Sequence, residues 1–155
     1  MKHLKIGDLA PTFTAIDQAG NKVSLTDYSG KRVVLYFYPK DDTPGCTTQA
    51  CNIRDNYAIL QKEDIVILGV SADSEKKHQK FIAKFELPFT LIADEEKALI
   101  NLYGVWGEKK FMGKIYDGIH RTTFLLDDSH KIVGIIDKPK NKEHTQEILE
   151  IYGND

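Results

Sequence analysis

The sequence predicts one α/β domain over residues 1–155, and three patterns carry this prediction. Two continuous apolar runs, at residues 33–38 and 65–71, have the composition of strands that are covered on both faces. Segments with apolar residues three and four positions apart follow these runs, as expected of amphipathic helices. Near the C-terminus, two more apolar runs flank residues 127–130 and predict an antiparallel hairpin.

A hairpin and a strand followed by a helix come first along the chain. Residues 13–17 and 22–25 flank a turn and predict a short N-terminal hairpin, and the strand at 33–38 ends at Pro39. From Cys46 the apolar positions are four, three, four and three residues apart, which predicts one helical face pointing inward over four turns. These positions are Cys46, Ala50, Ile53, Tyr57 and Leu60.

The second half of the chain repeats strand and helix and then changes. The predicted elements are a strand at 65–71, a helix through His78, Phe81, Ile82 and Phe85 with Ser74 as N-cap, a strand at 89–92, a helix over 95–103 with Gly104 as C-cap, strands at 122–126 and 131–136, and a closing helix through Thr145, Ile148, Leu149 and Tyr152 that stops at Gly153. This order is a thioredoxin-like arrangement with an N-terminal β-hairpin and an insertion near residues 86–120, before the last hairpin.

The charge balance and the short apolar runs exclude two classes of partner. Lys plus Arg number 21 and Asp plus Glu number 23, so the formal net charge is −2 and we expect no nucleic acid partner. The apolar runs are far shorter than the ~18 residues that a membrane-spanning helix needs, so we expect no membrane insertion. The first 13 residues contain no continuous apolar stretch, so we expect no signal peptide and a cytoplasmic location.

The most informative segment is the loop between the strand at 33–38 and the helix that follows it. Cys46 falls in the first helical turn, where unpaired backbone N–H groups and the helix macrodipole stabilise a thiolate. Thr43 offers a hydroxyl three residues earlier, Pro39 stiffens the loop, and Gly45 allows close approach of a small ligand. The alternative is a simple turn before a helix whose cysteine belongs to the core.

A second cysteine follows at Cys51, and the spacing Cys-x4-Cys matches neither zinc ribbons nor thioredoxin-type redox centres. No second cysteine pair or close histidine pair completes a tetrahedral site, so we expect no metal. In an α-helix, residues five apart are separated by about 8.7 Å at Cα. A disulfide needs roughly 4.4 to 6.8 Å, so a bond between Cys46 and Cys51 requires the helix to unwind.

The loop resembles the active-site signature of the peroxiredoxins, Pro-x3-Thr-x2-Cys, which the chain carries at Pro39, Thr43 and Cys46. The run TPGCTTQAC at 43–51 is similar to the subfamily called bacterioferritin comigratory protein, or peroxiredoxin Q. The resemblance covers nearly the whole chain and implies a thioredoxin-like fold of the peroxiredoxin type. Its other motifs are Gly7-Asp8-x2-Pro11-x-Phe13, Arg54-Asp55, Tyr103-Gly104-Val105-Trp106 and the segment 118–127.

The resemblance implies a role for each residue of this signature. Cys46 is then the peroxidatic cysteine, whose thiolate attacks a peroxide and becomes a sulfenic acid. Cys51 is the resolving cysteine, which forms an intramolecular disulfide with Cys46 that a thioredoxin-like dithiol reduces. Pro39 and Gly45 belong to the substrate-binding part of the site. Arg121 matches the active-site arginine, and it is one of only three arginines in the chain. The alternative for Arg121 is a surface salt bridge.

We therefore expect a thioredoxin-dependent peroxidase that acts on hydrogen peroxide and alkyl hydroperoxides, as a monomer, without a metal, haem or flavin cofactor. The donors expected to stabilise its transition state are Arg121, the Thr43 hydroxyl and the N–H groups of Gly45 and Cys46. Pro44 is expected to shield the thiolate, together with Pro39. Two other functions stay open, namely a thiol–disulfide oxidoreductase and a peroxide sensor that passes its disulfide to a partner.

Four further residues receive weaker interpretations. Trp106 and Phe124 are candidates for walls of the pocket, although core positions suit both. The pair Asp41-Asp42 is interpreted as a solvated loop, because two adjacent carboxylates without spaced oxygen ligands do not make a metal site.

Overall fold

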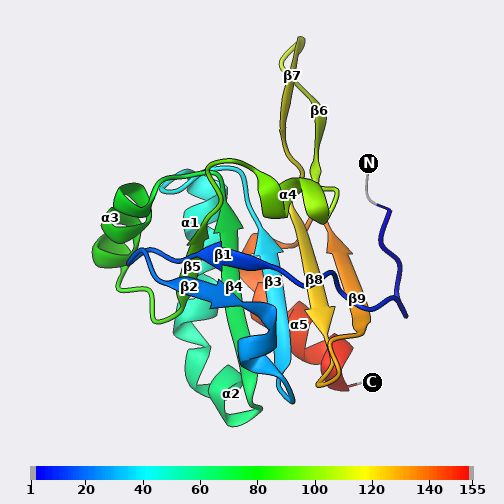
Figure 1. Ribbon diagram of the computed structural model, residues 1–155. Helices are drawn as coiled ribbons and strands as arrows, with labels where there is room; N and C mark the ends of the chain where they lie inside the picture. Colours follow the sequence, from blue (N-terminus) through cyan, green and yellow to red (C-terminus); the bar gives the residue numbers. More distant parts are fainter. Residues whose placement is uncertain (1–2, 154–155) are drawn as a thin grey trace.

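The centre of the fold is a five-stranded mixed sheet (Figure 1). The computed structural model describes residues 3–153. The strand order is β5 (Thr90–Ala93), β4 (Ile65–Ser71), β3 (Arg32–Phe37), β8 (Thr122–Leu126) and β9 (Ile132–Asp137). β3, β4 and β5 run parallel, whereas β8 pairs antiparallel with both β3 and β9. The carboxyl end of β3 therefore lies beside the amino end of β8.

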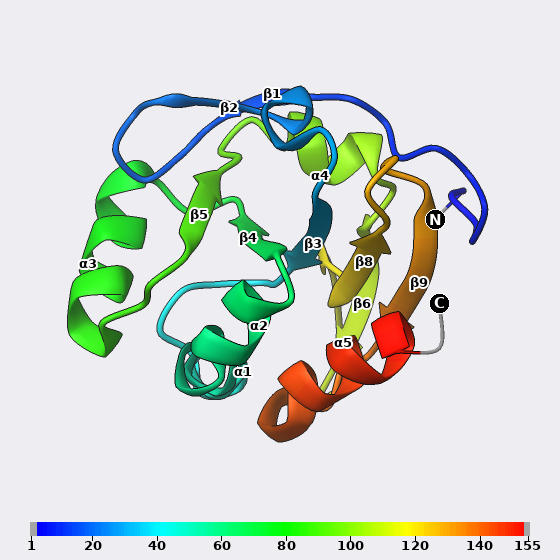
Figure 2. The same ribbon diagram turned by 90° about the horizontal axis from the view of Figure 1, so that it is seen from below.

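Helices cover one face of this sheet, and a hairpin with a short helix covers the other (Figure 2). The first face carries α1 (Pro44–Asp55), α2 (Tyr57–Lys62) and α5 (His144–Gly153), which follows the 3-10 helix η2 (Asn141–Glu143). The second face carries β1 (Thr14–Ile16), β2 (Lys22–Ser24), the 3-10 helix η1 (Leu25–Tyr28) and α4 (Ala98–Leu102). At the β5 edge of the sheet lies α3 (Glu75–Phe85).

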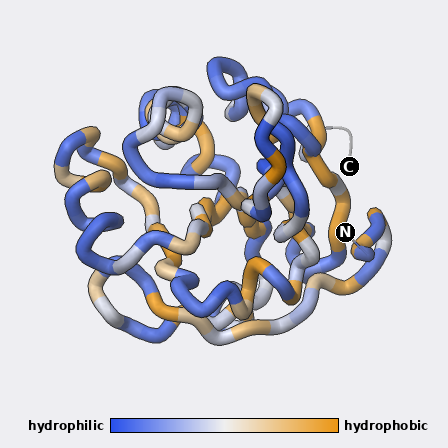
Figure 3. The backbone as a smooth tube through the Cα atoms, turned by 90° about the horizontal axis from the view of Figure 1, so that it is seen from above, coloured by the Kyte–Doolittle hydropathy of each residue, from blue (hydrophilic) through white to orange (hydrophobic). Residues whose placement is uncertain are grey.

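Each face of β3 contributes to a different core cluster. Tyr36 packs in the cluster that also contains Cys46 and Phe81, whereas its neighbours Leu35 and Phe37 pack in the cluster on the β1–β2 side. Side chains alternate between the two faces of a strand, so both faces of β3 must be apolar. Figure 3 shows the same distribution, with hydrophobic residues along the interior strands and much of the outer rim hydrophilic.

Most of the predicted elements are confirmed. The five strands of the central sheet begin and end within one residue of the predicted positions, and the N-terminal hairpin is present as β1 and β2. The predicted cap of α3 is also present, because Ser74 Oγ accepts a hydrogen bond from the Lys77 N–H at 3.2 Å. α5 reaches Gly153, the last residue that the structure describes. The α/β class and the order of elements are therefore confirmed.

The single helix predicted over 46–60 is two helices in the structure, so this prediction is wrong. α1 ends one residue before Asn56 and α2 begins one residue after it. Asn56 leaves the helical conformation, with φ −113° and ψ 14°. Its side-chain Nδ2 donates to the Asn52 carbonyl oxygen at 2.8 Å, and such a side-chain to backbone bond competes with a continuous helix. Leu60 is nevertheless buried, as its spacing predicts.

The helix predicted over 95–103 is shorter in the structure. α4 starts only at Ala98, because Lys97 takes the left-handed conformation with φ 61°. The carboxylate of Asp94 accepts from two backbone N–H groups of α4, at 3.2 and 2.7 Å, and so satisfies the start of the helix. Gly104 follows the helix with φ 67°, as the predicted C-cap glycine requires.

The insertion contains a hairpin that the sequence analysis did not assign. β6 (Trp106–Phe111) and β7 (Lys114–Ile119) pair antiparallel and project from the body of the molecule (Figure 1). Met112 and Gly113 form its turn with φ 52° and 82°, which suits a two-residue hairpin loop. Charged residues and glycines interrupt both strands, so no clear alternation marks them in the sequence. Within residues 3–153, no helix is both long and apolar enough to span a membrane.

Candidate active site

The start of α1 places Cys46 at the carboxyl end of β3. Thr43 is the N-cap residue in an extended conformation, and Pro44 occupies the first helical position, where its missing N–H costs nothing. The first backbone hydrogen bond of the helix runs from the Thr47 N–H to the Thr43 carbonyl oxygen at 2.8 Å. The N–H groups of Gly45 and Cys46 therefore have no partner inside the helix and are open to a ligand.

The sulfur of Cys46 is buried and accepts a hydrogen bond from Arg121. The cysteine is 1% exposed, and Arg121 Nη2 lies 3.0 Å from Sγ. Arg121 immediately precedes β8, whose first residue, Thr122, pairs with Phe37 at the end of β3. The antiparallel pairing of these two strands thus brings a guanidinium to a cysteine 75 positions away in the sequence. A cation beside a buried sulfur stabilises the thiolate.

Gln49 holds the same guanidinium from the second turn of α1. Arg121 Nη1 donates to Gln49 Oε1 at 3.0 Å, so two nitrogens of the fork are fixed by one helix. Gln49 is fully buried. Gln49 was not among the residues predicted for the site. Its signal was present, because Gln49 is three residues after Cys46 and therefore shares its helical face.

Gly45 is where a side chain does not fit. A Cβ atom there would lie 2.9 Å from Arg121 Nη2 and 3.1 Å from Asn141 Nδ2, which is closer than carbon atoms normally approach. Because Gly45 has no side chain, the guanidinium of Arg121 and the amide of Asn141 can both lie against the start of α1. The sequence predicted close approach at Gly45, and the structure identifies these two groups. Asn141 was not predicted.

Three buried polar atoms of the described residues have no hydrogen-bond partner, and two of them belong to residues just described. They are Tyr36 OH, Gln49 Nε2 and Asn141 Oδ1. Burial, reinforced by the negative charge of a Cys46 thiolate, raises the pKa of Tyr36 well above its ordinary value, so its hydroxyl stays protonated. Unpaired buried polar atoms are costly, and a small ligand rich in oxygen would satisfy those beside Arg121.

Two clefts open beside this site. One, of about 550 Å³, is lined by Arg121 and its neighbours; the other, of about 470 Å³, is lined by the start of α1 and by η2. In the first, Lys109 Nζ donates to the Ile119 carbonyl oxygen at 2.9 Å. Burial, with a smaller contribution from the positive charge of Arg121, lowers the pKa of Lys109. Cationic groups thus line the approach to the sulfur from the Arg121 side.

The other predicted site residues lie at varying distance from this arrangement. Thr43 Oγ donates to the Lys40 carbonyl oxygen at 2.9 Å, so the proton of its hydroxyl is engaged within the loop. Pro39 follows β3 and is half-buried. Cys51 lies half-buried on α1, and both cysteines are free thiols. The structure therefore keeps Cys46 and Cys51 five positions apart on one continuous helix.

Two aromatic residues considered as pocket walls lie on the other face of the sheet. Phe124 is fully buried in the cluster on the β1–β2 side, and Trp106 packs against that cluster. Cys46 belongs to the opposite cluster. Phe124 therefore serves the core, and the ring of Trp106 lies 5.1 Å from Lys97 Nζ in a cation–π contact.

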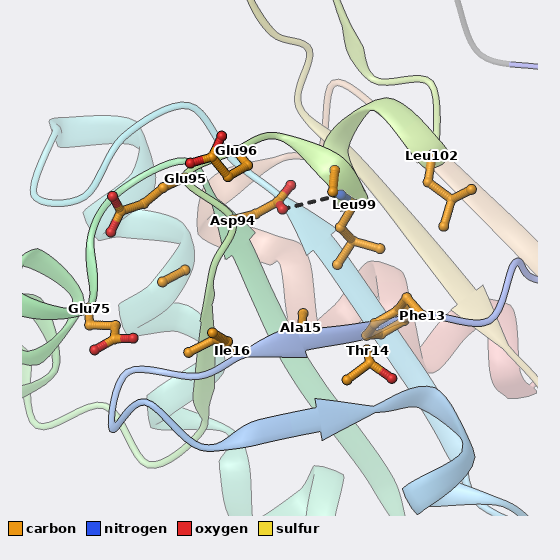
Figure 4. A pocket seen from close by; sticks show the side chains of 12 residues that line it. Phe13, Thr14, Ala15, Ile16, Glu75, Asp94, Glu95, Glu96, Leu99 and Leu102 are labelled. Carbon is orange, nitrogen blue, oxygen red and sulfur yellow. Dashed lines mark hydrogen bonds between the residues drawn. The ribbon is translucent and has the colours of Figure 1, made fainter.

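A further cleft, of about 540 Å³, lies on the β1 side and contains none of the predicted site residues (Figure 4). Its floor is apolar, with Phe13, Ile16 and Leu99, and carboxylates such as Asp94 and Glu95 line its rim. The Asp94 carboxylate is already engaged by α4, as the dashed line in Figure 4 shows. The cleft holds no cysteine and no arginine, so its chemistry differs from that of the Cys46 site.

The interpretation of Asp41 as part of a solvated loop is wrong. Asp41 is 9% exposed, and its Oδ2 lies 2.6 Å from Nδ1 of the fully buried His78. Asp42 is exposed as expected and pairs with Lys84 at 2.8 Å. Asp41, Asp73 and His78 place ligand-type atoms within 4.8 Å of one another, so they are the group among the described residues that could hold a cation.

Comparison with known proteins agrees with this geometry. Residues 6–135 match the AhpC/TSA family. This chain belongs to the AhpC/TSA family. It is 50% identical to peroxiredoxin Bcp of Escherichia coli over 149 residues, which cover 96% of each chain. The predicted resemblance to the peroxiredoxins of the bacterioferritin comigratory protein and peroxiredoxin Q type is thus confirmed.

Solved structures of relatives share the fold. A cysteine-to-serine mutant of PrxQ from Xylella fastidiosa superposes with a TM-score of 0.91 at 32% identity, covering 99% of this chain and 98% of that one. The bacterioferritin comigratory protein of Xanthomonas campestris gives a TM-score of 0.89 at 33% identity, with the same coverage. The predicted thioredoxin-like fold of the peroxiredoxin type is therefore confirmed for the family member described here.

Proposed function

We propose that this protein is a cytoplasmic thiol peroxidase that reduces hydrogen peroxide and alkyl hydroperoxides through Cys46 and is recycled by a thioredoxin-like dithiol. The observation that carries the proposal is the guanidinium of Arg121, which donates to a buried sulfur at the start of α1. Homology supports peroxidase chemistry, since relatives at 50% identity are peroxiredoxins. The relative from Xanthomonas campestris is described with alkyl peroxide reduction activity, which supports the second substrate class.

The first step is a displacement at oxygen. The Cys46 thiolate attacks one peroxide oxygen, the S–O bond forms as the O–O bond breaks, and the other oxygen leaves with a proton as water or alcohol. Negative charge moves from sulfur to the leaving oxygen during this step. Arg121 and the N–H groups of Gly45 and Cys46 face that charge, so they stabilise the transition state more than the ground state. Thr43 joins these donors only after its hydroxyl turns away from Lys40.

The second step joins the two cysteines. The Cys51 thiol attacks the sulfur of the Cys46 sulfenic acid, the S–S bond forms and water leaves. On α1 their Cα atoms are about 8.7 Å apart, beyond the reach of a disulfide, so part of the helix must unwind first. Asn52, beside Cys51, accepts from the Thr145 N–H and donates to the Lys142 carbonyl oxygen, each at 2.8 Å. We infer that these bonds hold the second half of α1 while the first turns open.

Pro39 and Pro44 shield the bound peroxide from bulk water, and Gly45, which has no side chain, lets the peroxide approach the start of α1 closely. Residues 1–155 act as one domain, and we propose that it works as a monomer, since both cysteines of the cycle lie on one helix. The cycle needs no metal or organic cofactor, because the sulfur itself changes oxidation state.

Two variants test the cycle. Cys46→Ser is expected to abolish peroxide consumption, because it removes the attacking sulfur. Cys51→Ser is expected to consume one equivalent of peroxide and then to stall, because its sulfenic acid has no partner on the helix. The measurement is peroxide consumption driven by thioredoxin and its reductase, with mass spectrometry of the protein after one equivalent. Substantial turnover by Cys46→Ser would refute the proposal.

The same preparation separates the two rival functions. A thiol–disulfide oxidoreductase would reduce insulin disulfides faster than it consumes peroxide. A peroxide sensor would form its disulfide once and would not turn over with excess reductant. We expect continuous peroxide turnover and slow insulin reduction.

A further inference from the structure

A buried hydrogen-bonded cluster lies beside the loop that leads to Cys46, and the reaction described above does not use it. We call it the Asp41 cluster, and its members are Tyr38, Asp41, Ser71, Asp73 and His78. His78, on α3, is fully buried at its centre. Its Nε2 lies 2.8 Å from the carbonyl oxygen of Ile92 on β5. A carbonyl oxygen only accepts, so Nε2 carries a proton and His78 donates to β5. Its Nδ1 faces Asp41 Oδ2 at 2.6 Å.

Asp41 is held from three directions. Tyr38 OH donates to Oδ1 at 2.5 Å, His78 contacts Oδ2, and the Asp41 backbone N–H donates to Asp73 Oδ2 at 2.8 Å. Asp73 in turn accepts from Ser71 Oγ at 2.7 Å. The loop is therefore tied to the ends of β4 and β5 and to α3. A fully satisfied polar network of this kind fixes one geometry.

The cluster is complete without a cation. A tetrahedral cation bound by a histidine nitrogen and a carboxylate oxygen at ~2.0 to 2.2 Å keeps the two ligand atoms about 3 Å apart or more. His78 Nδ1 and Asp41 Oδ2 are 2.6 Å apart, which is the distance of a direct hydrogen bond. Hydrogen bonds thus account for the closeness of Asp41, Asp73 and His78.

The loop connects this cluster to the reacting centre. Asp42 has a left-handed backbone with φ 59°, and Thr43, the next residue, donates its hydroxyl proton to the Lys40 carbonyl oxygen. Thr43 is also the N-cap of α1, so its position sets where the N–H groups of Gly45 and Cys46 point. Arg121 reaches the sulfur from β8 instead. The donors around Cys46 therefore come from two parts of the fold, which meet at Cys46 and Gln49 on α1.

We propose that His78 is a positioning residue for the peroxide reaction, which acts through Asp41 on the loop 38–43 and on the first turn of α1. The inference rests on the proposed peroxidase function. In this proposal the Asp41 cluster aligns Thr43 and the helix N–H groups with the peroxide, whereas Arg121 stabilises the thiolate. Misplacement of reacting groups by about 1 Å costs up to a hundredfold in rate.

Two nearly isosteric variants separate the two nitrogens of His78. The amide nitrogen of Asn lies where Nδ1 lies, so His78→Asn keeps a donor toward Asp41. The longer Gln places its amide near Nε2, so His78→Gln keeps the bond to Ile92 and loses the one to Asp41. We expect His78→Gln to slow oxidation of Cys46 by hydrogen peroxide on the order of tenfold to a hundredfold, and His78→Asn to retain most of the rate.

A second measurement distinguishes positioning from general loss of structure. Alkylation of Cys46 by iodoacetamide needs the thiolate but no peroxide donors, so we expect its rate to stay near that of the unaltered protein in both variants. Phe81→Leu, on the same helix and in the core cluster that contains Cys46, is the matched control for lost stability. It is expected to lower the thermal unfolding midpoint without slowing peroxide oxidation.

Four outcomes overturn a proposal. Equal peroxide rates for His78→Asn and His78→Gln overturn the role of His78, as does a parallel loss of alkylation. Loss of peroxide reactivity on treatment with EDTA, restored by Zn²⁺, overturns it in favour of a cation site at Asp41, Asp73 and His78. If the unaltered protein does not oxidise Cys46 with peroxide at all, the proposed function itself is refuted.

Discussion

α1 and α3 follow neighbouring parallel strands of one sheet, yet they begin in opposite ways. The start of α3 is closed, because Ser74 Oγ accepts from the Lys77 N–H and Glu75 adds a negative charge to the first turn. The start of α1 has no side-chain cap, and the hydroxyl of Thr43 turns back to Lys40. Both helices bury polar side chains, since α1 buries Cys46 and Gln49 and α3 buries His78 beside Phe81.

The difference shows that a helix start that binds a substrate is less stable than a capped one. A capped helix satisfies its first N–H groups and gains on the order of 1 kcal/mol from each cap. α1 leaves the N–H groups of Gly45 and Cys46 open, and it places a buried cysteine and a buried amide where an ordinary helix has apolar side chains. The groups that suit a peroxide are therefore the groups that make the first turns of α1 the weaker part of the fold.

The largest effect is expected from removing Arg121, whose guanidinium contacts Cys46 on α1. Arg121→Ala is expected to slow sulfenic acid formation about a hundredfold to a thousandfold, as loss of one transition-state donor from a dry site does. Rapid mixing with hydrogen peroxide measures it. Arg32→Ala, at the start of β3 and in contact with the ring of Tyr152, is the control and is expected to keep its rate. Loss of thiolate stabilisation by itself can lower the ionised fraction of a thiol at pH 7 by about thirtyfold. A rate loss smaller than this would therefore need no transition-state role for Arg121 and would contradict it.

Hydrogen exchange tests the comparison directly. In the reduced protein, we expect both helices to be protected. After one equivalent of peroxide, the first turns of α1, within residues 44–55, are expected to lose protection because the Cys46–Cys51 bond cannot form on an intact helix, whereas residues 75–85 keep theirs. Exchange followed by mass spectrometry gives both values in one experiment. Equal protection of 44–55 in both states, with the disulfide verified, would refute the unwinding of α1.

Removal of the α3 cap should have a smaller and purely structural effect. Ser74→Ala is expected to lower the free energy of unfolding by about 1 kcal/mol, because the Lys77 N–H loses its acceptor. Denaturant unfolding measures this change. The rate of peroxide oxidation is expected to stay the same, since no atom of Ser74 contacts the Cys46 site. A slower reaction would mean that the start of α3 also controls the loop through His78.

The smallest expected effect concerns His144, a buried side chain at the start of α5. Burial lowers the pKa of His144, at the start of α5, although Glu147 partly opposes the shift. The unfolded chain therefore binds this proton more readily, so stability is complete above about pH 6.5 and declines as the pH falls below it. We expect the thermal midpoint to fall between pH 7.5 and 5.5, and to fall less in His144→Gln. An equal fall in both proteins would exclude His144 as the cause.

The sequence by itself determined the local features of α1 and α3. Residue periodicity marked both helices, Ser74 marked one start, and the order of proline, glycine and cysteine placed Cys46 in the first turn of the other. These features depend on neighbours within about one helical turn, so the pattern of residue types is enough to predict them. The spacing of Cys46 and Cys51 also predicted that they share a helix and cannot bond without unwinding.

Only the tertiary structure decided which distant groups meet. The family resemblance alone predicted Arg121 at the site; it reaches the Cys46 sulfur because β8 pairs antiparallel with β3, and no local pattern encodes that register. His78 matched the apolar stripe of α3, yet its contact with Asp41 turned a loop expected to be solvated into a buried anchor. The break at Asn56 and the projecting β6–β7 hairpin were likewise invisible in the periodicity. Contacts between residues far apart depend on how the sheet orders its strands, and that order minimises the free energy of the whole chain rather than of any one segment.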